Sequence, residues 1–382
     1  MSSNITKVDK SGRKYFTFAE PPGQIILENG SLLGPVTIAY ETYGQLAADK
    51  SNVILIEHAF SGDSHVACHA EDEDEASRPG WWDNMVGPEK GIDTNIYFVV
   101  CANILGGCMG TTGPTSLNPA TGKPYGLDFP VVTIADMVHV QKKLLDFLGI
   151  KQVLSVIGGS VGGMQVLQWC VSYPEMVRSA VPLATTMRHS ALAIAFNEVA
   201  RQAIMADPHW NGGDYYGKAM PEMGLAVARM IAHITYLSDE SMRRKFGRNL
   251  QDKSDFSFNF DVDFQVESYL RYQGSKFVRR FDANSFLYIT KAADYFDLEA
   301  SDGTSINTLN DSQTRFLVVS FTSDWLYPTY QSKELVKALK KNGLDVSFCE
   351  IEADCGHDAF LLPNCRLDSL IAGFLKGVAE ND

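Results

Sequence analysis

The chain has 382 residues, of which 45% are apolar and 21% charged, as in folded globular proteins and unlike disordered or fibrous ones. A formal net charge of −13 disfavours binding to nucleic acid, and the sequence has no stretch of about 18 consecutive apolar residues that would predict a membrane span. The N-terminus lacks the apolar segment of a signal peptide, and the seven cysteines include no CxxC pair, so we expect a cytoplasmic protein without a disulfide framework.

Strands are predicted throughout the first 160 residues. GQIILENG (23–30) and GPVTIAYETYG (34–44) predict antiparallel strands near the N-terminus. Three short apolar runs rich in β-branched residues then predict strands of a mostly parallel sheet: VILIEHAF (53–60), YFVVCAN (97–103) and VLSVIGG (153–159).

Helical patterns separate these runs. In TIADMVHVQKKLLDFLG (133–149) the apolar residues recur at intervals of three and four, and a glycine ends the pattern. Strands that alternate with helices predict an α/β domain with right-handed crossovers.

The alternation stops between about residues 186 and 312, where the patterns are helical, and it resumes with strand runs at 315–321 and 346–353. We therefore predict a core in two parts, 1–185 and 313–382, with a helical cap inserted at 186–312.

The segment SVIGGSVGGMQVLQW places Ser160 between two glycine pairs, after a strand run and before a helical pattern. This context gives meaning to the G-x-S-x-G pattern of residues 158–162, because a sharp strand-to-helix turn exposes the serine hydroxyl at a helix N-terminus. The alternative interpretation is a glycine-rich turn that only packs tightly.

A serine hydroxyl needs a base, and the base needs a carboxylate that fixes its tautomer. Asp324 follows the strand run at 315–321, and His357 follows the one at 346–353. Parallel strands bring both residues to the same sheet edge as Ser160, so we predict a Ser160–His357–Asp324 triad. The loop HAFSGDSH (58–65) predicts an oxyanion hole from the backbone N–H groups of Phe60 and Val161.

Three other segments contain residues typical of binding sites, but we predict no binding site in any of them. His65 and His69 precede the acidic run EDEDEAS (71–77), but the HExxH pattern is absent and a surface loop explains the run, so we predict no metal. GGCMGTTG (106–113) lacks the Lys-Ser/Thr ending of a P-loop. The basic run MRRKFGR (242–248) is interpreted as a solvated helix end.

The triad alone leaves esterase, peptidase, thioesterase and transferase open. Long segments from about residue 38 onwards resemble the homoserine O-acetyltransferases of the methionine-biosynthetic MetX type, within the α/β-hydrolase superfamily. They are AYETYG, PGWWDNMVGPEKGIDT, NILGGCMGTTGPTSLNP, KPYGLDFPVVTIADMV, GGSVGGMQVLQW, ARMIAHITYLS, FDANSFLYITKAADYFDL and SDWLYP with GHDAF. One departure is Val161, where the family pattern has methionine, but only its backbone N–H is needed.

The resemblance implies an α/β-hydrolase fold with a helical cap and a ping-pong reaction in methionine biosynthesis. Acetyl-CoA would acetylate Ser160, CoA would leave, and the hydroxyl of L-homoserine would take the acetyl group, with His357 as the base in each half. Acetyl-CoA and L-homoserine would be the small-molecule substrates, no cofactor would stay bound, and a homodimer is expected.

The resemblance also assigns residues to the acceptor and to the acyl group. Asp358 would bind the ammonium of homoserine and Arg229 its carboxylate, and Tyr236, two helical turns after Arg229, would contribute a hydroxyl. Succinyl-using relatives place an arginine where this chain has Leu326, so Leu326 favours the neutral acetyl group.

The sequence is also compatible with four other activities or roles. They are a homoserine O-succinyltransferase or L-serine O-acetyltransferase of the same family, an esterase whose acyl group passes to water, and a binding protein that has lost activity.

Overall fold

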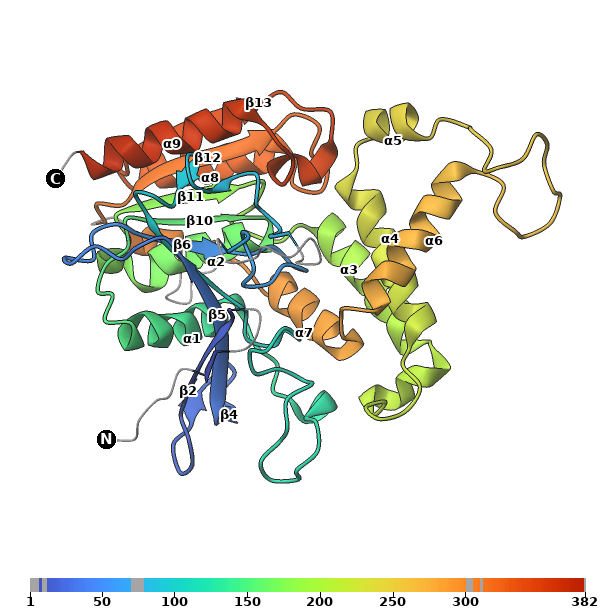
Figure 1. Ribbon diagram of the computed structural model, residues 1–382, viewed down its shortest axis with the longest axis horizontal. Helices are drawn as coiled ribbons and strands as arrows, with labels where there is room; N and C mark the ends of the chain where they lie inside the picture. Colours follow the sequence, from blue (N-terminus) through green and yellow to red (C-terminus); the bar gives the residue numbers. More distant parts are fainter. Residues whose placement is uncertain (1–6, 9–11, 70–78, 300–304, 310–311, 381–382) are drawn as a thin grey trace.

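The computed structural model describes residues 7–8, 12–69, 79–299, 305–309 and 312–380, and in it helices cover both faces of a central sheet (Figure 1). Within these residues the sheet has nine strands in the order β1-β2-β5-β9-β6-β10-β11-β12-β13. The pairings from β1 to β9 are antiparallel, and those from β9 to β13 are parallel. The predicted mostly parallel sheet is confirmed.

The strands of this sheet are β1 (Lys7–Val8), β2 (Lys14–Phe18), β5 (Val36–Tyr43), β6 (Val53–Glu57), β9 (Phe98–Ala102), β10 (Ser155–Gly159), β11 (Ser179–Leu183), β12 (Arg315–Phe321) and β13 (Val346–Ile351). Two further pairs lie outside it: β3 (Ile25–Ile26) with β4 (Leu32–Leu33), and β7 (Val86–Gly87) with β8 (Ile92–Asp93).

The predicted strands agree with these bounds except at two places. The run 53–60 ends as strand β6 at Glu57, because the chain then leaves the sheet for a turn. Of the predicted strand 23–30 only β3 is extended, because the N–H of Gly30 donates to the carbonyl of Leu27 at 2.8 Å and closes a turn. Strands β1, β2 and β11 of the main sheet were not predicted.

The helices of the core are α1 (Ile134–Phe147), α2 (Val161–Ser172), α8 (Thr329–Lys341) and α9 (Cys365–Ala379). Side chains of α1, α2 and α8 are buried in one apolar cluster, and those of α9 in the cluster on the other face of the sheet. The predicted helix 133–149 is α1, and it begins with a capping box in which the Thr133 hydroxyl accepts from the N–H of Asp136 at 3.2 Å.

Five helices lie between β11 and β12 in the segment predicted as a cap: α3 (Ala191–Met205), α4 (Glu222–Tyr236), α5 (Asp239–Lys245), α6 (Gln265–Val278) and α7 (Ala283–Asp294). Helix α4 contacts both α3 and α6, and the group extends to one side of the sheet (Figure 1). Short 3-10 helices occupy Gly126–Asp128, Pro174–Met176, Pro208–Gly213, Ile306–Leu309 and Gly356–Phe360.

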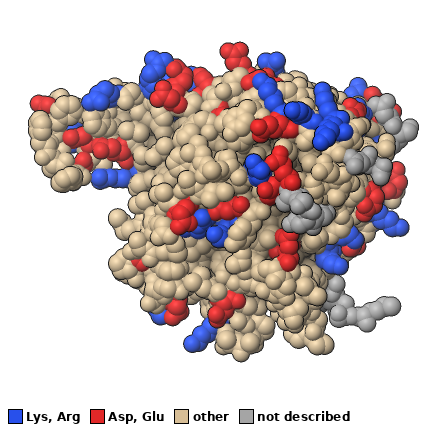
Figure 2. Space-filling model, turned by 180° about the vertical axis from the view of Figure 1, so that it is seen from behind, with Lys and Arg blue, Asp and Glu red and all other residues tan. Residues whose placement is uncertain are grey.

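The charged surface mixes both signs. Figure 2 shows lysine and arginine side chains on one face of the molecule scattered among aspartate and glutamate. In the basic run 242–248, Arg243 pairs with Glu240 and Arg244 with Asp354, which agrees with a solvated helix end. None of the helices in the described residues is both long and apolar enough to cross a bilayer.

Helix α2 lies so close to strand β6 that neither Gly158, at the end of β10, nor Gly162, in the first turn of α2, has room for a Cβ. A Cβ at Gly158 would come within 2.7 Å of the carbonyl oxygen of Glu57, and a Cβ at Gly162 within 2.1 Å of the same atom. Both contacts involve backbone, so relief of either one requires the helix or the strand to move.

We expect Gly162→Ala to lower the free energy of unfolding by about 1–3 kcal/mol or more, since it overpacks a rigid contact. The matched control is Gly373→Ala in α9, where a Cβ meets nothing within 4 Å and the higher helix propensity of alanine should be neutral or stabilising. Urea unfolding followed by fluorescence measures both variants, and equal stabilities of the two would contradict the packing argument.

Candidate active site

Ser160 lies at the corner between β10 and α2. Its backbone angles are φ 60° and ψ −125°, which a residue with a Cβ rarely adopts, and it occupies the N-cap position of α2. The side chain is therefore directed away from both the strand and the helix, next to the backbone N–H groups of the first helical turn. Such a corner supports a nucleophile beside an anion site.

Asp324 follows strand β12 and His357 follows strand β13, as predicted. His357 is in the 3-10 helix after β13, and its Nδ1 lies 2.8 Å from Oδ2 of Asp324. The other carboxylate oxygen of Asp324 accepts from the N–H groups of Leu326 and Tyr327 at 3.0 and 2.9 Å. A fixed anion at Nδ1 favours the tautomer whose Nε2 is free to accept a proton.

The electrostatic surroundings of His357 favour its charged form. Burial alone would lower the pKa of this imidazole, but the charge and hydrogen bond of Asp324 and the charge of Asp358 outweigh burial and raise the pKa above its usual value. A base with a raised pKa binds the proton of a hydroxyl more strongly, as general-base catalysis requires.

Two cavities meet at Ser160. The charged cavity, of about 190 Å³, is lined by Ser160, His357, Asp358, Arg229 and Tyr236, with Phe60, Arg280 and Trp81 among the other lining residues. The mainly apolar cavity, of about 60 Å³ and here called the apolar cavity, is lined by Val161, Leu326, Tyr327 and alanine and aromatic side chains of the cap. Its polar lining residues include His189, Asn197, Thr235 and Thr290. Phe60, Ser160 and Tyr236 line both cavities.

The sequence-predicted residues therefore lie together around the two cavities, with Asp324 buried behind His357. Asp358 lies beside His357, and burial raises the pKa of its carboxyl although the charges of His357 and Arg229 oppose that rise. The guanidinium carbon of Arg229 lies 5.5 Å from the ring centre of Tyr236, so these two cap residues adjoin.

A hydrogen-bonded chain beside Ser160 was not predicted. The hydroxyl of Tyr327 lies 3.2 Å from Nε2 of His189, whose Nδ1 is 3.2 Å from a carboxylate oxygen of Asp294. Tyr327 also interacts with the side chain of Ser160, and burial raises the pKa of its phenol. Tyr327 is near Asp324 in sequence, but no sequence pattern joins it to residues 189 and 294.

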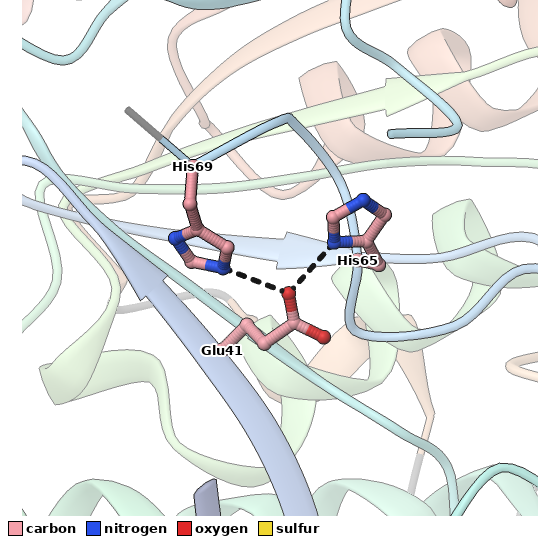
Figure 3. Close-up of side chains that lie close together, drawn as sticks. All are labelled: Glu41, His65 and His69. Carbon is pink, nitrogen blue, oxygen red and sulfur yellow. Dashed lines mark hydrogen bonds and ion pairs between the residues drawn. The ribbon is translucent and has the colours of Figure 1, made fainter. Parts of the chain in front are cut away.

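His65 and His69 both contact Glu41, so these three side chains offer a possible ligand set (Figure 3). Nδ1 of His65 and Nε2 of His69 lie 2.9 and 3.0 Å from Oε2 of Glu41, which also accepts from the hydroxyl of Tyr43. The other carboxylate oxygen, Oε1, accepts from the hydroxyl of Ser64. Although burial raises it, the pKa of Glu41 is held well below its usual value by these hydrogen bonds.

Hydrogen bonding to one buried carboxylate accounts for this cluster, so the absence of a metal stays a prediction. The acidic run 71–77 lies outside the described residues.

Comparison with known proteins identifies relatives over nearly the whole chain. Residues 52–363 match the family model of the alpha/beta hydrolase fold. A homoserine O-acetyltransferase of Desulfotalea psychrophila is 66% identical over 368 residues, which cover 96% of this chain and 94% of the relative.

Two solved structures are equally similar in backbone. The homoserine O-acetyltransferase from Bacillus anthracis is 32% identical with a TM-score of 0.85 and 96% of each chain covered. Esterase E22 is also 32% identical with a TM-score of 0.85, covering 95% of this chain and 99% of its own. Backbone similarity alone therefore does not separate transfer to an alcohol from transfer to water.

The pH dependence of acylation tests the electrostatics of His357. With His357 as base, the rate rises with pH through the pKa of this imidazole, because only the neutral form accepts a proton. Asp358→Asn removes a charge that stabilises the imidazolium, so the acidic limb of kcat/KM for p-nitrophenyl acetate should move to lower pH. Asp345→Asn changes an exposed carboxylate and should leave the limb in place; a shift upward for Asp358→Asn would contradict the assignment.

Proposed function

Since the chain belongs to the homoserine O-acetyltransferase family of α/β-hydrolases, we propose that it moves an acetyl group from acetyl-CoA to the hydroxyl of L-homoserine in methionine biosynthesis. The observation that carries this proposal is the pairing of a guanidinium, Arg229, with a carboxylate, Asp358, in the charged cavity at Ser160. An esterase has no evident need for this pair, whereas an amino-acid acceptor offers one charge to each member.

The first half-reaction forms an acetyl-serine. Nε2 of His357 takes the proton of Ser160 as its Oγ attacks the thioester carbon, and the resulting oxyanion accepts from the N–H groups of Phe60 and Val161. Collapse breaks the C–S bond, and the imidazolium protonates the CoA thiolate. Asp324 holds the imidazole in the required orientation and stabilises its charged form.

The second half-reaction uses the same groups in reverse. His357 takes the proton of the homoserine hydroxyl, whose oxygen attacks the acetyl carbon, and the oxyanion again accepts from the N–H groups of Phe60 and Val161. Collapse releases Oγ of Ser160, which regains a proton from the imidazolium. The products are O-acetyl-L-homoserine and the free enzyme.

The acceptor is held by its two charges. Asp358 pairs with the ammonium, which relieves the burial cost of its carboxylate, and Arg229 pairs with the carboxylate through its planar guanidinium. The hydroxyl of Tyr236 lies in the same cavity, on the helix that carries Arg229. Serine is one methylene shorter than homoserine, so its hydroxyl would stop short of the acetyl carbon when both charges are paired.

The apolar cavity suits a small neutral acyl group. None of the described residues that line it is Lys or Arg, and Leu326 forms part of its wall. A succinyl group would bring a carboxylate into a cavity whose imidazole, His189, already faces the carboxylate of Asp294, and burial of an unpaired charge costs several kcal/mol. Acetyl-CoA is therefore the favoured donor.

Activity measurements with two donors and two acceptors test the proposed function. We expect CoA release from acetyl-CoA to be much faster with L-homoserine than with L-serine or buffer alone, and slow with succinyl-CoA. A rate that does not change when homoserine is added would refute the transfer and favour the esterase.

Ser160→Ala should lower turnover by several orders of magnitude, because the nucleophile acts as one unit with His357 and Asp324. Without acceptor, the unmodified enzyme treated with acetyl-CoA should gain one acetyl group on the peptide that carries Ser160, as measured by mass spectrometry. An acetyl group found elsewhere, or full turnover in the variant, would contradict the assignment.

Leu326→Arg tests the acyl cavity. A guanidinium in its wall can pair with the succinyl carboxylate, so kcat/KM for succinyl-CoA relative to acetyl-CoA should rise by roughly tenfold or more. The matched control is Leu326→Gln, which is polar and similar in length but uncharged. An equal change in both variants would mean that charge at this position does not select the donor.

A further inference from the structure

The loop that carries Phe60 is a tight turn of residues 59–62, here called the oxyanion turn. The N–H of Gly62 donates to the carbonyl of Ala59 at 2.9 Å, which places Phe60 and Ser61 at the two central positions. This closing bond does not use the N–H of Phe60, which is therefore available to a ligand. A Cβ at Gly62 would lie 2.9 Å from Cβ of His58, so the last residue of the turn packs closely against the residue that precedes the turn.

The cap holds this turn from outside through aromatic contacts. The ring of Phe60 packs against Phe281 and Phe286, with ring centres 5.8 and 4.9 Å away. Phe281 lies just before α7 and Phe286 in its first turn, in the segment inserted between β11 and β12. The core residue that supplies the N–H is thus fixed by side chains of the cap.

Two cap arginines converge on the next residue of the turn. Nη1 of Arg280 lies 3.0 Å from the backbone carbonyl oxygen of Ser61, and Nη1 of Arg229 lies 3.3 Å from the hydroxyl of the same residue. Their guanidinium carbons lie 5.4 and 4.6 Å from the ring centre of Phe277, which is buried. Contact with this ring restricts the positions of both guanidiniums beside the turn.

The two contacts differ in what they hold. Arg280 donates to the backbone, so its hydrogen bond fixes the conformation of the turn itself. Within the oxyanion turn, Arg229 contacts a side-chain hydroxyl at a longer distance, and a carboxylate can replace that hydroxyl. One arginine therefore suits a role in the structure of the turn, and the other suits a role in binding the acceptor.

We propose that Arg280 is a positioning residue that holds the oxyanion turn from the cap and so directs the N–H of Phe60 at the carbonyl oxygen of the acyl group. This rests on the proposed function for the identity of the two substrates. An oxyanion forms in the acylation of Ser160 and again in its deacylation, so Arg280 acts in both half-reactions. Arg229 acts only in the half-reaction that involves the amino acid.

Ping-pong kinetics separates these roles, because kcat/KM for each substrate reports only the half-reaction of that substrate. In Arg280→Ala we expect kcat/KM for acetyl-CoA and for homoserine to fall together, by roughly tenfold or more, since loss of a complete oxyanion donor costs about a hundredfold or more. In Arg229→Ala only kcat/KM for homoserine should fall.

A second readout uses L-homoserine amide, an acceptor that lacks the carboxylate. Arg280→Ala should keep the preference for homoserine over its amide, whereas Arg229→Ala should lose that preference. Arg279→Ala is the matched control, since Arg279 is the exposed neighbour at the end of α6, and both kcat/KM values should stay unchanged. Arg280→Lys keeps the positive charge on one ammonium nitrogen in place of the planar guanidinium, and it should restore part of the loss.

The outcomes are distinct. A loss in Arg280→Ala confined to homoserine would overturn the proposal and make Arg280 a ligand of the acceptor carboxylate, and unchanged values for both substrates would overturn it as well. If Arg280→Ala does not fold, Arg280→Lys carries the same test.

Hydrolysis of p-nitrophenyl acetate tests the positioning role of Arg280 in a reaction that does not depend on homoserine as the acceptor. Both of its steps pass through the same oxyanion, so Arg280→Ala should slow acylation and deacylation even if homoserine proves not to be the acceptor. A normal rate of ester hydrolysis in this variant would overturn the positioning role alone.

Discussion

The backbone at Ser160 is the constraint on which the site depends. A φ of 60° at a residue with a Cβ costs of the order of 1–3 kcal/mol and persists only where its surroundings fix it. Here the fixing element is the close approach of α2 to β6, which leaves no room for a Cβ at Gly158 or Gly162. The same approach places the N-terminus of α2 at the serine, so one backbone arrangement exposes the hydroxyl and supplies the N–H of Val161.

A buried carboxyl group underlies this junction. Glu57 ends strand β6 opposite Gly158, and its oxygens accept from the side chains of Trp169 and Gln141 at 2.8 and 2.7 Å. Burial raises the pKa of Glu57 to about 8, although these two hydrogen bonds oppose the rise. Burial therefore favours the neutral form of this carboxyl group, and its hydrogen bonds join β6, α1 and α2 in one buried polar network at the junction.

The sequence was sufficient for the parts of the site that depend on local geometry or on strand order. The glycines around Ser160 identify the turn, and Asp324 and His357 each follow a recognisable strand. Contacts between distant segments could not be predicted in this way. Arg280 meets Ser61, 219 positions away in the sequence, and His65 and His69 both meet Glu41 of strand β5. Such contacts follow from how the cap and loops pack, which no local pattern records.

The two cavities suggest how transfer to an alcohol can exceed transfer to water. On the proposed function, the acyl group occupies the neutral cavity while the acceptor enters the charged one, and both reach Ser160 beside Phe60 and Tyr236. Pairing of two charges on the acceptor supplies binding energy that water lacks, and this energy places one hydroxyl at the acetyl carbon. On this proposal a related esterase can share the backbone, because the distinction between the two acceptors is expected in the side chains that line the second cavity.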